Sequence, residues 1–217
     1  MDKDSLVKIL YLKDIDSTQN FLKKLIKGKE VQAPFAVLSD MQSAGVGSRD
    51  NSWNSQKGNL FLSFAIKLNE LPKDLKLESA SIYFSYIFKN LLCEEGSCVW
   101  MKWPNDFYID DKKIGGMITN FDGDTLICGL GLNLVIAPEG FAKLDIIVDK
   151  KEVLKKYFKK IEEKISWKQV FSKYQLEFYK NKNFFTHNKN IKIPLEDFKL
   201  QQDGSIISNG ERIYSRR

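Results

Sequence analysis

The sequence predicts an α+β fold with a mixed or antiparallel central sheet. The chain opens with one strand and one amphipathic helix, but from about residue 59 most apolar segments are short and separated by hairpin turns. Strands joined by tight turns pair antiparallel, whereas a regular alternation of strands and helices favours a parallel sheet. A length of 217 residues with 43% hydrophobic content is enough for one domain with a real core.

The first elements expected are a strand, a helix and a second strand. The first strand covers residues 6–12, and the helix follows a cluster of capping residues, Asp14 to Thr18. Its apolar residues recur at helical spacing until Gly28, a suitable C-cap. The second strand is Phe35 to Leu38. Capping explains one or two of the four hydrogen-bonding residues at positions 17–20, which could equally line a pocket for a polar, uncharged group.

A long segment rich in glycine and serine, Gln42 to Trp53, follows the second strand. Loops of this length are commonly functional or mobile. Its glycines would let backbone amides close on an anion, while Arg49 would add charge and Trp53 a stacking surface. The segment is neither a Walker loop nor a dinucleotide fingerprint, because the lysine of the first and the third glycine of the second are missing. A plain surface loop is the alternative.

The middle of the chain predicts a strand at residues 59–68, a helix at 77–92 and then three more strands. The first of these three, Val99 to Met101, should stop near Pro104, because proline cannot donate to a sheet ladder. The second is residues 107–109, followed by a turn at 110–111 and a strand that carries Lys113. A hairpin signal at residues 121–124 leads into residues 126–134, whose two glycines mark a bulge or a place where a ligand approaches.

Two neighbouring strand ends in this region carry groups that suit chemistry. Lys102-Trp103-Pro104-Asn105-Asp106 is followed seven residues later by Lys113-Ile114-Gly115-Gly116. Two lysines, an amide and a carboxylate thereby reach one place, an arrangement that suits a negatively charged substrate and phosphate in particular. Taken alone, the first five residues also fit an ordinary strand followed by an ordinary turn.

Two helices and a small β tail complete the expected fold. The helices begin near Asp149 and Ser166, each with a Glu or Gln three residues on in capping-box spacing. From about Thr186 the pattern changes to short strands, expected at residues 191–193, 198–200 and 205–207. Turn signals at Asp203-Gly204 and Asn209-Gly210 separate them. We expect this tail to pack on the main body instead of forming an independent domain.

Composition excludes several classes of function. The net charge of +6 permits nucleic-acid binding, but the lysines are scattered among acids and apolar residues, which is typical of a solvated face. The same charge favours a phosphate-bearing substrate or an anionic partner protein. Three cysteines without metal-ligand spacing and one histidine, His187, argue against a zinc site or a Ser-His or Cys-His nucleophile. With no signal peptide or membrane-spanning run, we expect a reduced cytoplasmic enzyme.

Taken in order, these segments resemble the catalytic region of biotin–protein ligases, enzymes that attach biotin to one lysine of a carrier protein. Asp16-Ser17-Thr18 is similar to the start of the Ser-Thr-Asn biotin motif, and residues 42–53 resemble the Gly-Arg-Gly-Arg-Arg-Gly adenylate loop. Residues 102–106 match the Lys-Trp-Pro-Asn-Asp signature. Residues 113–116 resemble the segment with the principal lysine, and residues 129–133 the Gly-Ile-Gly-Ile-Asn segment.

The resemblance covers roughly residues 8–135 and has clear departures. Gln19 stands where the family usually has asparagine. Val46, Ser48 and Asn51 occupy positions of loop arginines, so fewer cations should hold the adenylate. The ligase strand begins almost at residue 6, without a winged-helix segment before it, so no DNA-binding role is expected. The tail is shorter than the SH3-like domain of many family members.

The resemblance implies that biotin and ATP give biotinyl-5′-AMP and pyrophosphate, and that biotin then passes to a lysine of a biotin carboxyl carrier protein, an acetyl-CoA carboxylase subunit. Residues 1–185 would form the catalytic domain and 186–217 a reduced SH3-like segment, in a monomer or a homodimer. ATP and Mg²⁺ are the implied cofactors. The implied catalytic residues are Lys113, Asp106 and Lys102; the biotin-binding residues are Ser17, Thr18, Gln19, Gln42, Gly45, Gly115, Gly116 and Leu132; the ATP- or adenylate-binding residues are Gly47, Arg49, Trp53, Asn105, Lys113 and Asn133.

Two other functions stay open. A lipoate– or octanoate–protein ligase would share the fold, but the Arg-x-x-Gly-Gly-Gly stretch of the lipoate group is missing here. A nucleic-acid-binding module is supported only by the net charge. A ligase should protect a biotinyl-adenylate analogue, whereas a nucleic-acid-binding module should retain nucleic acid through high salt.

Overall fold

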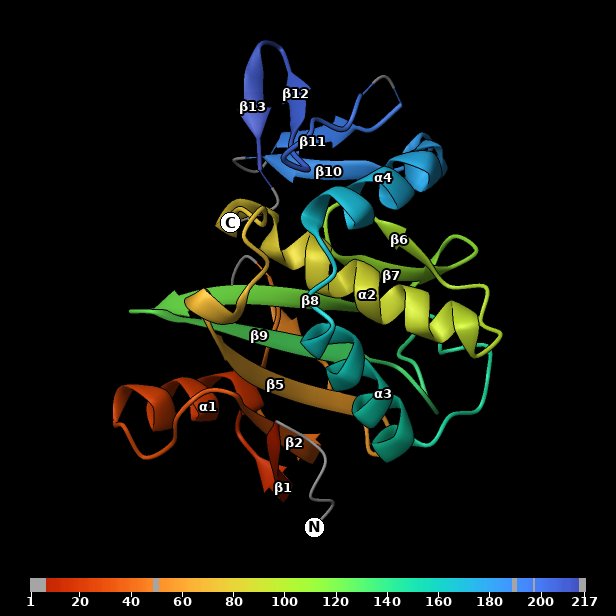
Figure 1. Ribbon diagram of the computed structural model, residues 1–217. Helices are drawn as coiled ribbons and strands as arrows, with labels where there is room; N and C mark the ends of the chain where they lie inside the picture. The colour runs from red at the N-terminus through yellow and green to blue at the C-terminus, as the bar shows by residue number, and fades with distance from the viewer. Residues whose placement is uncertain (1–6, 49–50, 189–190, 197, 215–217) are drawn as a thin grey trace.

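A seven-stranded mixed sheet organises the structure (Figure 1). The computed structural model describes residues 7–48, 51–188, 191–196 and 198–214. The first two strands of the sheet pair parallel and all other neighbours pair antiparallel, which confirms the predicted fold class. In spatial order the strands are β1 (Lys8–Ile15), β2 (Phe35–Gln42), β5 (Leu60–Lys67), β9 (Thr125–Leu132), β8 (Lys112–Asp122), β7 (Asp106–Ile109) and β6 (Trp100–Lys102).

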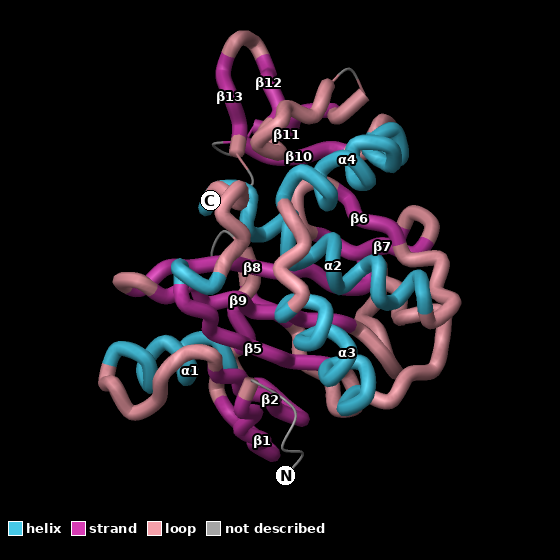
Figure 2. Tube along the Cα trace, in the orientation of Figure 1, coloured by secondary structure: helices cyan, strands magenta, loops and turns pink. Residues whose placement is uncertain are grey.

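Helices cover both faces of this sheet (Figures 1 and 2). Helix α1 lies on one face, α2 and α3 lie on the other, and α4 packs against α2. Strand β2 shows how the sequence separates the faces. Its Val37 joins Leu22 of α1, whereas its neighbour Leu38 joins the larger core under α2, because successive strand residues point to opposite faces. The helices are α1 (Thr18–Lys27), α2 (Ala80–Glu94), α3 (Lys150–Glu162) and α4 (Trp167–Glu177).

Apart from the segment between residues 42 and 53, the predicted order of elements is confirmed as far as helix α4, and most differences there lie at element ends. Strand β2 continues four residues past the predicted Leu38, to Gln42. The helix predicted from residue 77 begins at Ala80, after a 3₁₀ turn at Leu77–Ser79. The segment predicted as a loop from Gln42 to Trp53 contains a two-strand ladder, β3 (Gly45–Val46) and β4 (Ser52–Trp53). The hairpin at residue 123 is present, with Gly123 at a φ of +56°.

Helix α4 begins with the predicted capping box. The Ser166 hydroxyl accepts from the backbone amide of Gln169, and the Gln169 side chain accepts from the backbone amide of Ser166. We expect Ser166→Ala to destabilise the fold by about 1 kcal/mol, because it removes the acceptor for one helix-end amide. The melting temperature should fall by about 2 to 4 °C. Ser172→Ala, an exposed serine of the same helix, is the control; an equal fall in both variants would contradict the capping role.

The C-terminal tail folds as two small hairpins. They are β10 (Phe185–Asn188) with β11 (Ile191–Pro194), and β12 (Ile206–Ser208) with β13 (Glu211–Ile213). The strand predicted at 198–200 is wrong: Leu200 is buried in the core, so the apolar pattern there reflects an anchored irregular segment. The strand predicted at 205–207 is shifted by one residue.

Hydrogen bonds attach this tail to the main body. The indole of Trp103 donates to the carbonyl of Gly204 at 2.8 Å, and the indole of Trp167 donates to the carbonyl of Gln202 at 2.8 Å. Ser79, just before α2, donates to the carbonyl of Asp203. The tail therefore packs on the helices, while the domain boundary near residue 186 stays a prediction.

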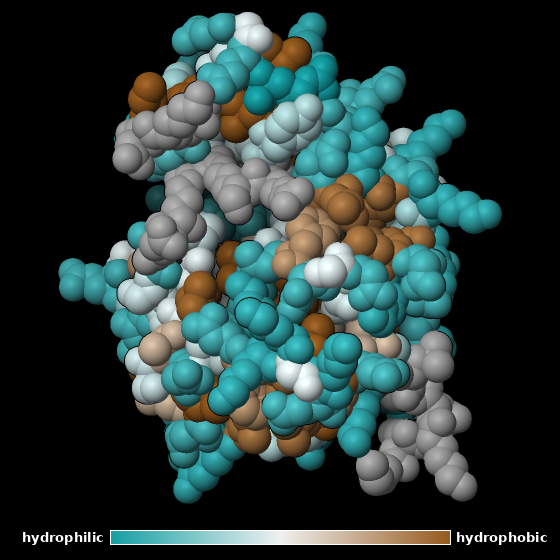
Figure 3. Space-filling model, turned by 90° about the vertical axis from the view of Figure 1, so that its left-hand side faces the viewer, coloured by the Kyte–Doolittle hydropathy of each residue, from teal (hydrophilic) through white to brown (hydrophobic). Residues whose placement is uncertain are grey.

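Hydrophilic side chains cover most of the face seen in Figure 3. Within the described ranges, the helices are too short or too polar to cross a bilayer. Cys93, Cys98 and Cys128 are free thiols. Burial raises the pKa of the Cys93 and Cys128 thiols, so both are protonated at neutral pH and are poor nucleophiles.

Candidate active site

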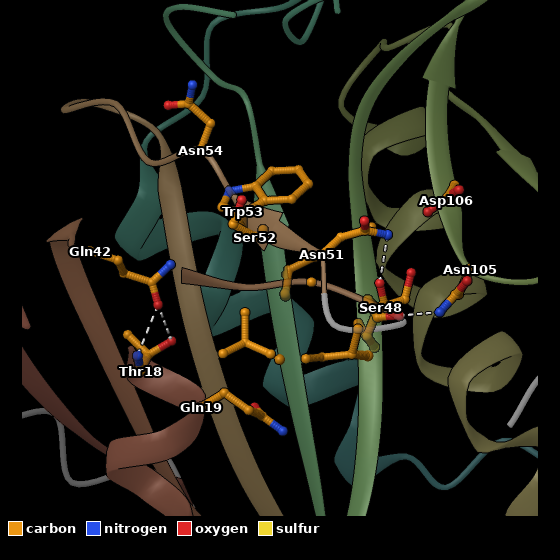
Figure 4. Close-up of a pocket in the computed structure, with 18 of the residues that line it drawn as sticks. Thr18, Gln19, Gln42, Ser48, Asn51, Ser52, Trp53, Asn54, Asn105 and Asp106 are labelled. Atoms are coloured by element: carbon orange, nitrogen blue, oxygen red, sulfur yellow. Dashed lines mark hydrogen bonds between the residues drawn. The ribbon is translucent and has the colours of Figure 1, made fainter. Parts of the chain in front are cut away.

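A cavity of about 420 Å³ lies on the sheet where the N-terminus of α1, the β3–β4 segment and strands β5, β8 and β9 meet. Figure 4 shows Thr18 and Gln42 on one side of this cavity, Asn105 and Asp106 on the other, and Trp53 above. Segments that are far apart in the sequence therefore contribute to one site. The predicted site residues that line it are Thr18, Gln19, Gln42, Gly47, Trp53, Asn105, Asp106, Lys113, Gly116 and Asn133.

One end of the cavity is polar and uncharged. The carbonyl oxygen of the Gln42 side chain accepts from both the backbone amide and the hydroxyl of Thr18, at 2.8 and 3.0 Å. The Thr18 hydroxyl also lies 2.9 Å from the hydroxyl of Ser63 on β5. These contacts fix the orientation of the three side chains before any ligand arrives.

Gln19 adds an unsatisfied acceptor to the same end. Its side-chain nitrogen donates to Asn120 Oδ1 at 3.0 Å and to the carbonyl of Ile127 at 3.3 Å. Its Oε1 is buried and has no hydrogen-bond partner within the described part of the chain. A buried acceptor left unpaired costs about 1–3 kcal/mol, so this atom favours a ligand that brings an N–H or O–H group.

Gly129 of β9 makes room for this glutamine. A Cβ at residue 129 would lie 2.6 Å from Gln19 Oε1, closer than atoms can approach. The glycine therefore leaves room for the Gln19 side chain against the strand. The two glycines of β9 were predicted to mark a bulge or a place where a ligand approaches. The regular register with β5 and β8 excludes a bulge. Both glycines line the cavity, so the ligand approach stays a prediction.

The opposite end of the cavity is charged. Lys113 Nζ on β8 lies 2.6 Å from Asp106 Oδ1 on β7, and Lys102 Nζ on β6 lies 4.0 Å from Asp106 Oδ2. All three side chains are mostly buried, with exposed fractions of 14% to 26%. Two cations around one carboxylate leave a net positive site that suits an anionic substrate.

A β-bulge brings Lys113 to this cavity. The β7–β8 register pairs Phe107 with Gly115 but Tyr108 with Lys113, so Ile114 is the extra residue on β8. In a regular strand, residues 113 and 116 would point to opposite faces. Here both line the cavity, and a Cβ on Gly116 would lie 3.7 Å from Lys113 Cε. Bulges redirect side chains in this way, frequently next to active sites.

Asn105 and Trp103 hold the charged end in place. The Asn105 side chain donates to the carbonyl of Met117, and the Asn105 carbonyl accepts from the Met117 amide at 3.0 Å. Trp103 is fully buried, and its backbone amide donates to Asn181 Oδ1 at 2.7 Å. In the Lys-Trp-Pro-Asn-Asp stretch, the tryptophan therefore anchors the turn while the lysine and the carboxylate face the site.

Trp53 lies directly on β9. A Cβ at Gly131 would come within 2.7 Å of Trp53 Cε2, and the indole Nε1 is buried with no partner in the described part of the chain. Asn133, at the end of β9, is 1% exposed and donates to the carbonyl of Ala142 at 3.1 Å. Trp53 thus lines the cavity while its unpaired indole donor lies against β9, and Asn133 braces the loop at the cavity rim.

Several predicted site residues lie elsewhere. Ser17 is fully buried and caps α1 through the amide of Asn20, so it does not line the cavity. Gly115 and Leu132 do not line it either: a Cβ on Gly115 would lie 2.7 Å from Leu132 Cδ1, in the packed core. Gly45 permits close pairing of β3 with β4. Lys102 lines a neighbouring cavity, and Arg49 lies outside the described residues.

Sequence reasoning missed two polar residues that shape the site. Ser63 is a single serine inside the apolar strand β5, and this interruption was the only available signal. Asn59, just before β5, accepts from the backbone amides of Leu134 and Val135 at 3.0 Å each. It therefore holds the start of the loop that closes one side of the cavity.

Burial perturbs two groups beside the charged end. Burial and then the negative charge of Asp106 raise the pKa of Tyr108, so its phenol stays neutral. Lys102 Nζ lies 5.7 Å from the centre of this phenol ring, an attractive cation–π distance. On α1, burial lowers the pKa of Lys23.

Comparisons with known proteins agree with this geometry. A model of the biotin/lipoate A/B protein ligase family matches residues 11–133. The structure of biotin acetyl coenzyme A carboxylase synthetase from Helicobacter pylori with bound biotinylated ATP superimposes with a TM-score of 0.92 at 36% identity, covering 96% of this chain and 99% of that one. Biotin protein ligase from Aquifex aeolicus, in complex with biotin and ATP, gives a TM-score of 0.76 at 26% identity, covering 95% and 94%.

Curated relatives match a shorter stretch. The bifunctional ligase/repressor BirA of Escherichia coli is 31% identical over 129 residues, which is 56% of this chain and 39% of that protein. The biotin–[acetyl-CoA-carboxylase] ligase of Paracoccus denitrificans is 31% identical over 137 residues, 58% of this chain and 55% of that protein. The stretch matched by the family model, residues 11–133, contains lining residues from both ends of the cavity.

Proposed function

Because the chain belongs to the biotin/lipoate A/B protein ligase family, we propose that it is a biotin–protein ligase. It would form biotinyl-5′-AMP and pyrophosphate from biotin and ATP, and then transfer biotin to a lysine of a biotin carboxyl carrier protein. The chain spans only 39% of the first curated relative, so the substrates and the acceptor are part of the proposal. The relatives from Helicobacter pylori and Aquifex aeolicus, which hold biotinylated ATP and biotin with ATP, support it.

One observation carries this proposal: the cavity is uncharged and hydrogen-bonding at one end and cationic at the other. Biotin has the matching ends, a neutral ureido ring and a carboxylate. Its ureido N–H groups would satisfy Gln19 Oε1, which has no partner in the described residues, and its carboxylate would lie near Lys113. A lipoate ring or an octanoate chain has no N–H group to offer, so Gln19 would stay unpaired, which disfavours both.

In the first half-reaction, a biotin carboxylate oxygen attacks the α-phosphorus of ATP. Two anions must approach, so positive charge at the meeting point lowers the barrier. Lys113 lines both this cavity and the one that contains Lys102, and it is our candidate for contacting the carboxylate and the α-phosphate together. Its contact with Asp106 orients the ammonium before substrates arrive.

In the second half-reaction, the acceptor lysine attacks the carbonyl carbon of the mixed anhydride and AMP leaves. The acceptor arrives as an ammonium and must lose a proton to become a nucleophile. Asp106 is the one carboxylate among the described residues that line the cavity, so it is our candidate for orienting this ammonium and accepting its proton. Trp53 and the β3–β4 segment would shield the anhydride from water.

Magnesium fits the site poorly as a resident ion. Among the described residues there is no group of three or more His, Cys, Asp or Glu side chains that could hold a metal ion. The carboxylate of Asp106 is already paired with Lys113. We therefore expect Mg²⁺ to arrive with the phosphate oxygens of ATP and not to be held by a protein ligand set.

Restoring arginines in the adenylate loop should slow product escape. Val46 and Ser48 are exposed, line the cavity and stand at family arginine positions. We expect Val46→Arg with Ser48→Arg to slow dissociation of biotinyl-5′-AMP about tenfold, because each guanidinium adds a charge-assisted hydrogen bond to the phosphate. Stopped-flow displacement of the adenylate measures this rate.

The matched control for the loop places the same two charges nearby but outside the cavity. Ser43→Arg with Ala44→Arg does so, because both residues are exposed and neither lines the cavity. An equal slowing in both double variants would mean that the overall positive potential of the protein holds the adenylate. Unchanged dissociation in Val46→Arg with Ser48→Arg would contradict a role for these loop positions.

Biotin-dependent exchange between ATP and pyrophosphate tests the proposed function. Purified protein should exchange labelled pyrophosphate into ATP when biotin is present, and should not do so with lipoate or octanoate. Exchange with octanoate or lipoate in place of biotin would assign the chain to the other branch of the family. Absence of exchange with all three acids would overturn the proposed activity.

A further inference from the structure

A second cavity, which we call the basic cavity, adjoins the first. Its volume is about 520 Å³, and it is lined by residues from α1, α2, β6, β7, β8 and β10. The residues that line both cavities include Lys113 and four that lie in the right-hand half of Figure 4: Ser48, Asn51, Asn105 and Asp106. A ligand that fills the first cavity can therefore extend into the second past Lys113.

The basic cavity carries an excess of positive charge. Lys23, Lys102 and Lys113 line it, together with His187 from the tail, and Asp106 is the one carboxylate among its described lining residues. Lys23 has no ion-pair partner within the described ranges, and burial lowers the pKa of its ammonium group. The Lys23 ammonium is therefore available to an anion that enters the cavity.

Ser81 provides an independent sign of a ligand. It lines the basic cavity, is 2% exposed, and its hydroxyl has no hydrogen-bond partner in the described part of the chain. It is the second residue of the 15-residue helix α2, whose first turn contains no acidic residue. The positive end of the helix dipole and a free hydroxyl donor therefore act together on the cavity.

We propose that the Ser81 hydroxyl, in the basic cavity, donates a hydrogen bond to the pyrophosphate that leaves in the adenylation step. This proposal rests on the function proposed above. As the carboxylate oxygen bonds to the α-phosphorus, the bond from that phosphorus to the bridging oxygen breaks. The electron pair stays on that oxygen, so pyrophosphate leaves with added negative charge. Lys102 and Ser81 then face the group on which charge develops.

The charge of the basic cavity argues against its being the entrance for the acceptor lysine. Three lysines line it against one carboxylate, so an incoming ammonium would be repelled. The acceptor would approach from another side of the first cavity. The two half-reactions would thus use different openings, with Lys113 and Asp106 at their junction.

Titration calorimetry with inorganic pyrophosphate and Mg²⁺ tests the role of Ser81. We expect Ser81→Ala to weaken pyrophosphate binding about tenfold, and Ser81→Thr, which keeps the hydroxyl, to restore most of it. The matched control is Ser85→Ala: Ser85 is also buried and unpaired in α2 but does not line the cavity, so its loss should leave binding unchanged. Wild-type affinity in Ser81→Ala, or no binding by the wild-type protein, would overturn the proposal.

Kinetics separates this proposal from the proposed function. In the exchange assay, Ser81→Ala should raise the KM for ATP and for pyrophosphate by a similar factor and leave the KM for biotin unchanged. A wild-type protein that binds pyrophosphate through Ser81 but exchanges it with none of the acids would overturn the biotin assignment and keep the basic cavity as a pyrophosphate site. Biotin-dependent exchange with KM values that Ser81→Ala leaves unchanged would keep the biotin assignment and overturn the role of Ser81.

Discussion

Lys113→Ala is expected to abolish biotin-dependent pyrophosphate release while leaving the protein folded. Lys113 lies at the junction of the two cavities, 2.6 Å from Asp106. In the proposed reaction it contacts both anions in the transition state, where a well-placed charge contributes a factor of about 10² to 10³ or more. The expected loss lies in kcat more than in KM, because the charge on the attacked phosphate grows only as the reaction proceeds.

The fold should tolerate this substitution. The Lys113 side chain is 26% exposed, and Asp106 keeps Lys102 nearby after the loss. Lys112→Ala is the matched control: it is the preceding residue of β8 and is exposed, so both rate and melting temperature should stay close to the wild-type values. Pyrophosphate release with circular dichroism on the same samples measures both. Near-normal pyrophosphate release by Lys113→Ala would contradict the role assigned to Lys113.

The sequence was most informative where one local rule decides the structure. The capping serine, the helical spacing of apolar residues and Gly28 placed α1 correctly, because each acts within a few residues of its own position. The stop of β6 before Pro104 followed in the same way from the missing amide of proline. These rules also explain why element order was predicted better than element ends.

The details of the site depended on contacts that no local pattern reports. The bulge at Ile114, where the register between β7 and β8 shifts, turns Lys113 toward the cavity. The sequence alone left Ser17 open to a helix cap or a ligand contact; the bond from the Asn20 amide shows the cap, and the ligand contact stays a prediction. The predicted strand at 198–200 failed because Leu200 is buried by tertiary packing and not by a sheet.

The two glycines of the Lys-Ile-Gly-Gly segment offer the sharpest separation of folding from chemistry. A Cβ on Gly115 would lie 2.5 Å from the backbone carbonyl of Gly131, which the β8–β9 ladder holds in place. A Cβ on Gly116 would lie 2.8 Å from Asp106 Oδ1, an atom at the free end of a side chain. The backbone cannot move without disturbing the sheet, whereas the carboxylate can turn away.

Gly115→Ala should therefore act on stability and Gly116→Ala on activity. We expect the first to cost about 1–3 kcal/mol, a fall in melting temperature of about 3 to 10 °C, as for other overpacked cores. The second should change the melting temperature little but lower the rate of adenylate formation about 10- to 100-fold, because Asp106 must leave its position beside Lys113. Thermal unfolding and pyrophosphate release on both variants test this.

Each outcome of the glycine pair bears on the mechanism. Full activity in Gly116→Ala would mean that the contact between Asp106 and Lys113 is not needed to orient the lysine. Equal destabilisation by both substitutions would mean that the carboxylate is held as firmly as the sheet itself. Gly116→Ala could instead form the adenylate normally and lose only the transfer of biotin. That result would assign Asp106 to the acceptor lysine, because in the transfer step the Asp106 carboxylate acts on the incoming ammonium and not through Lys113.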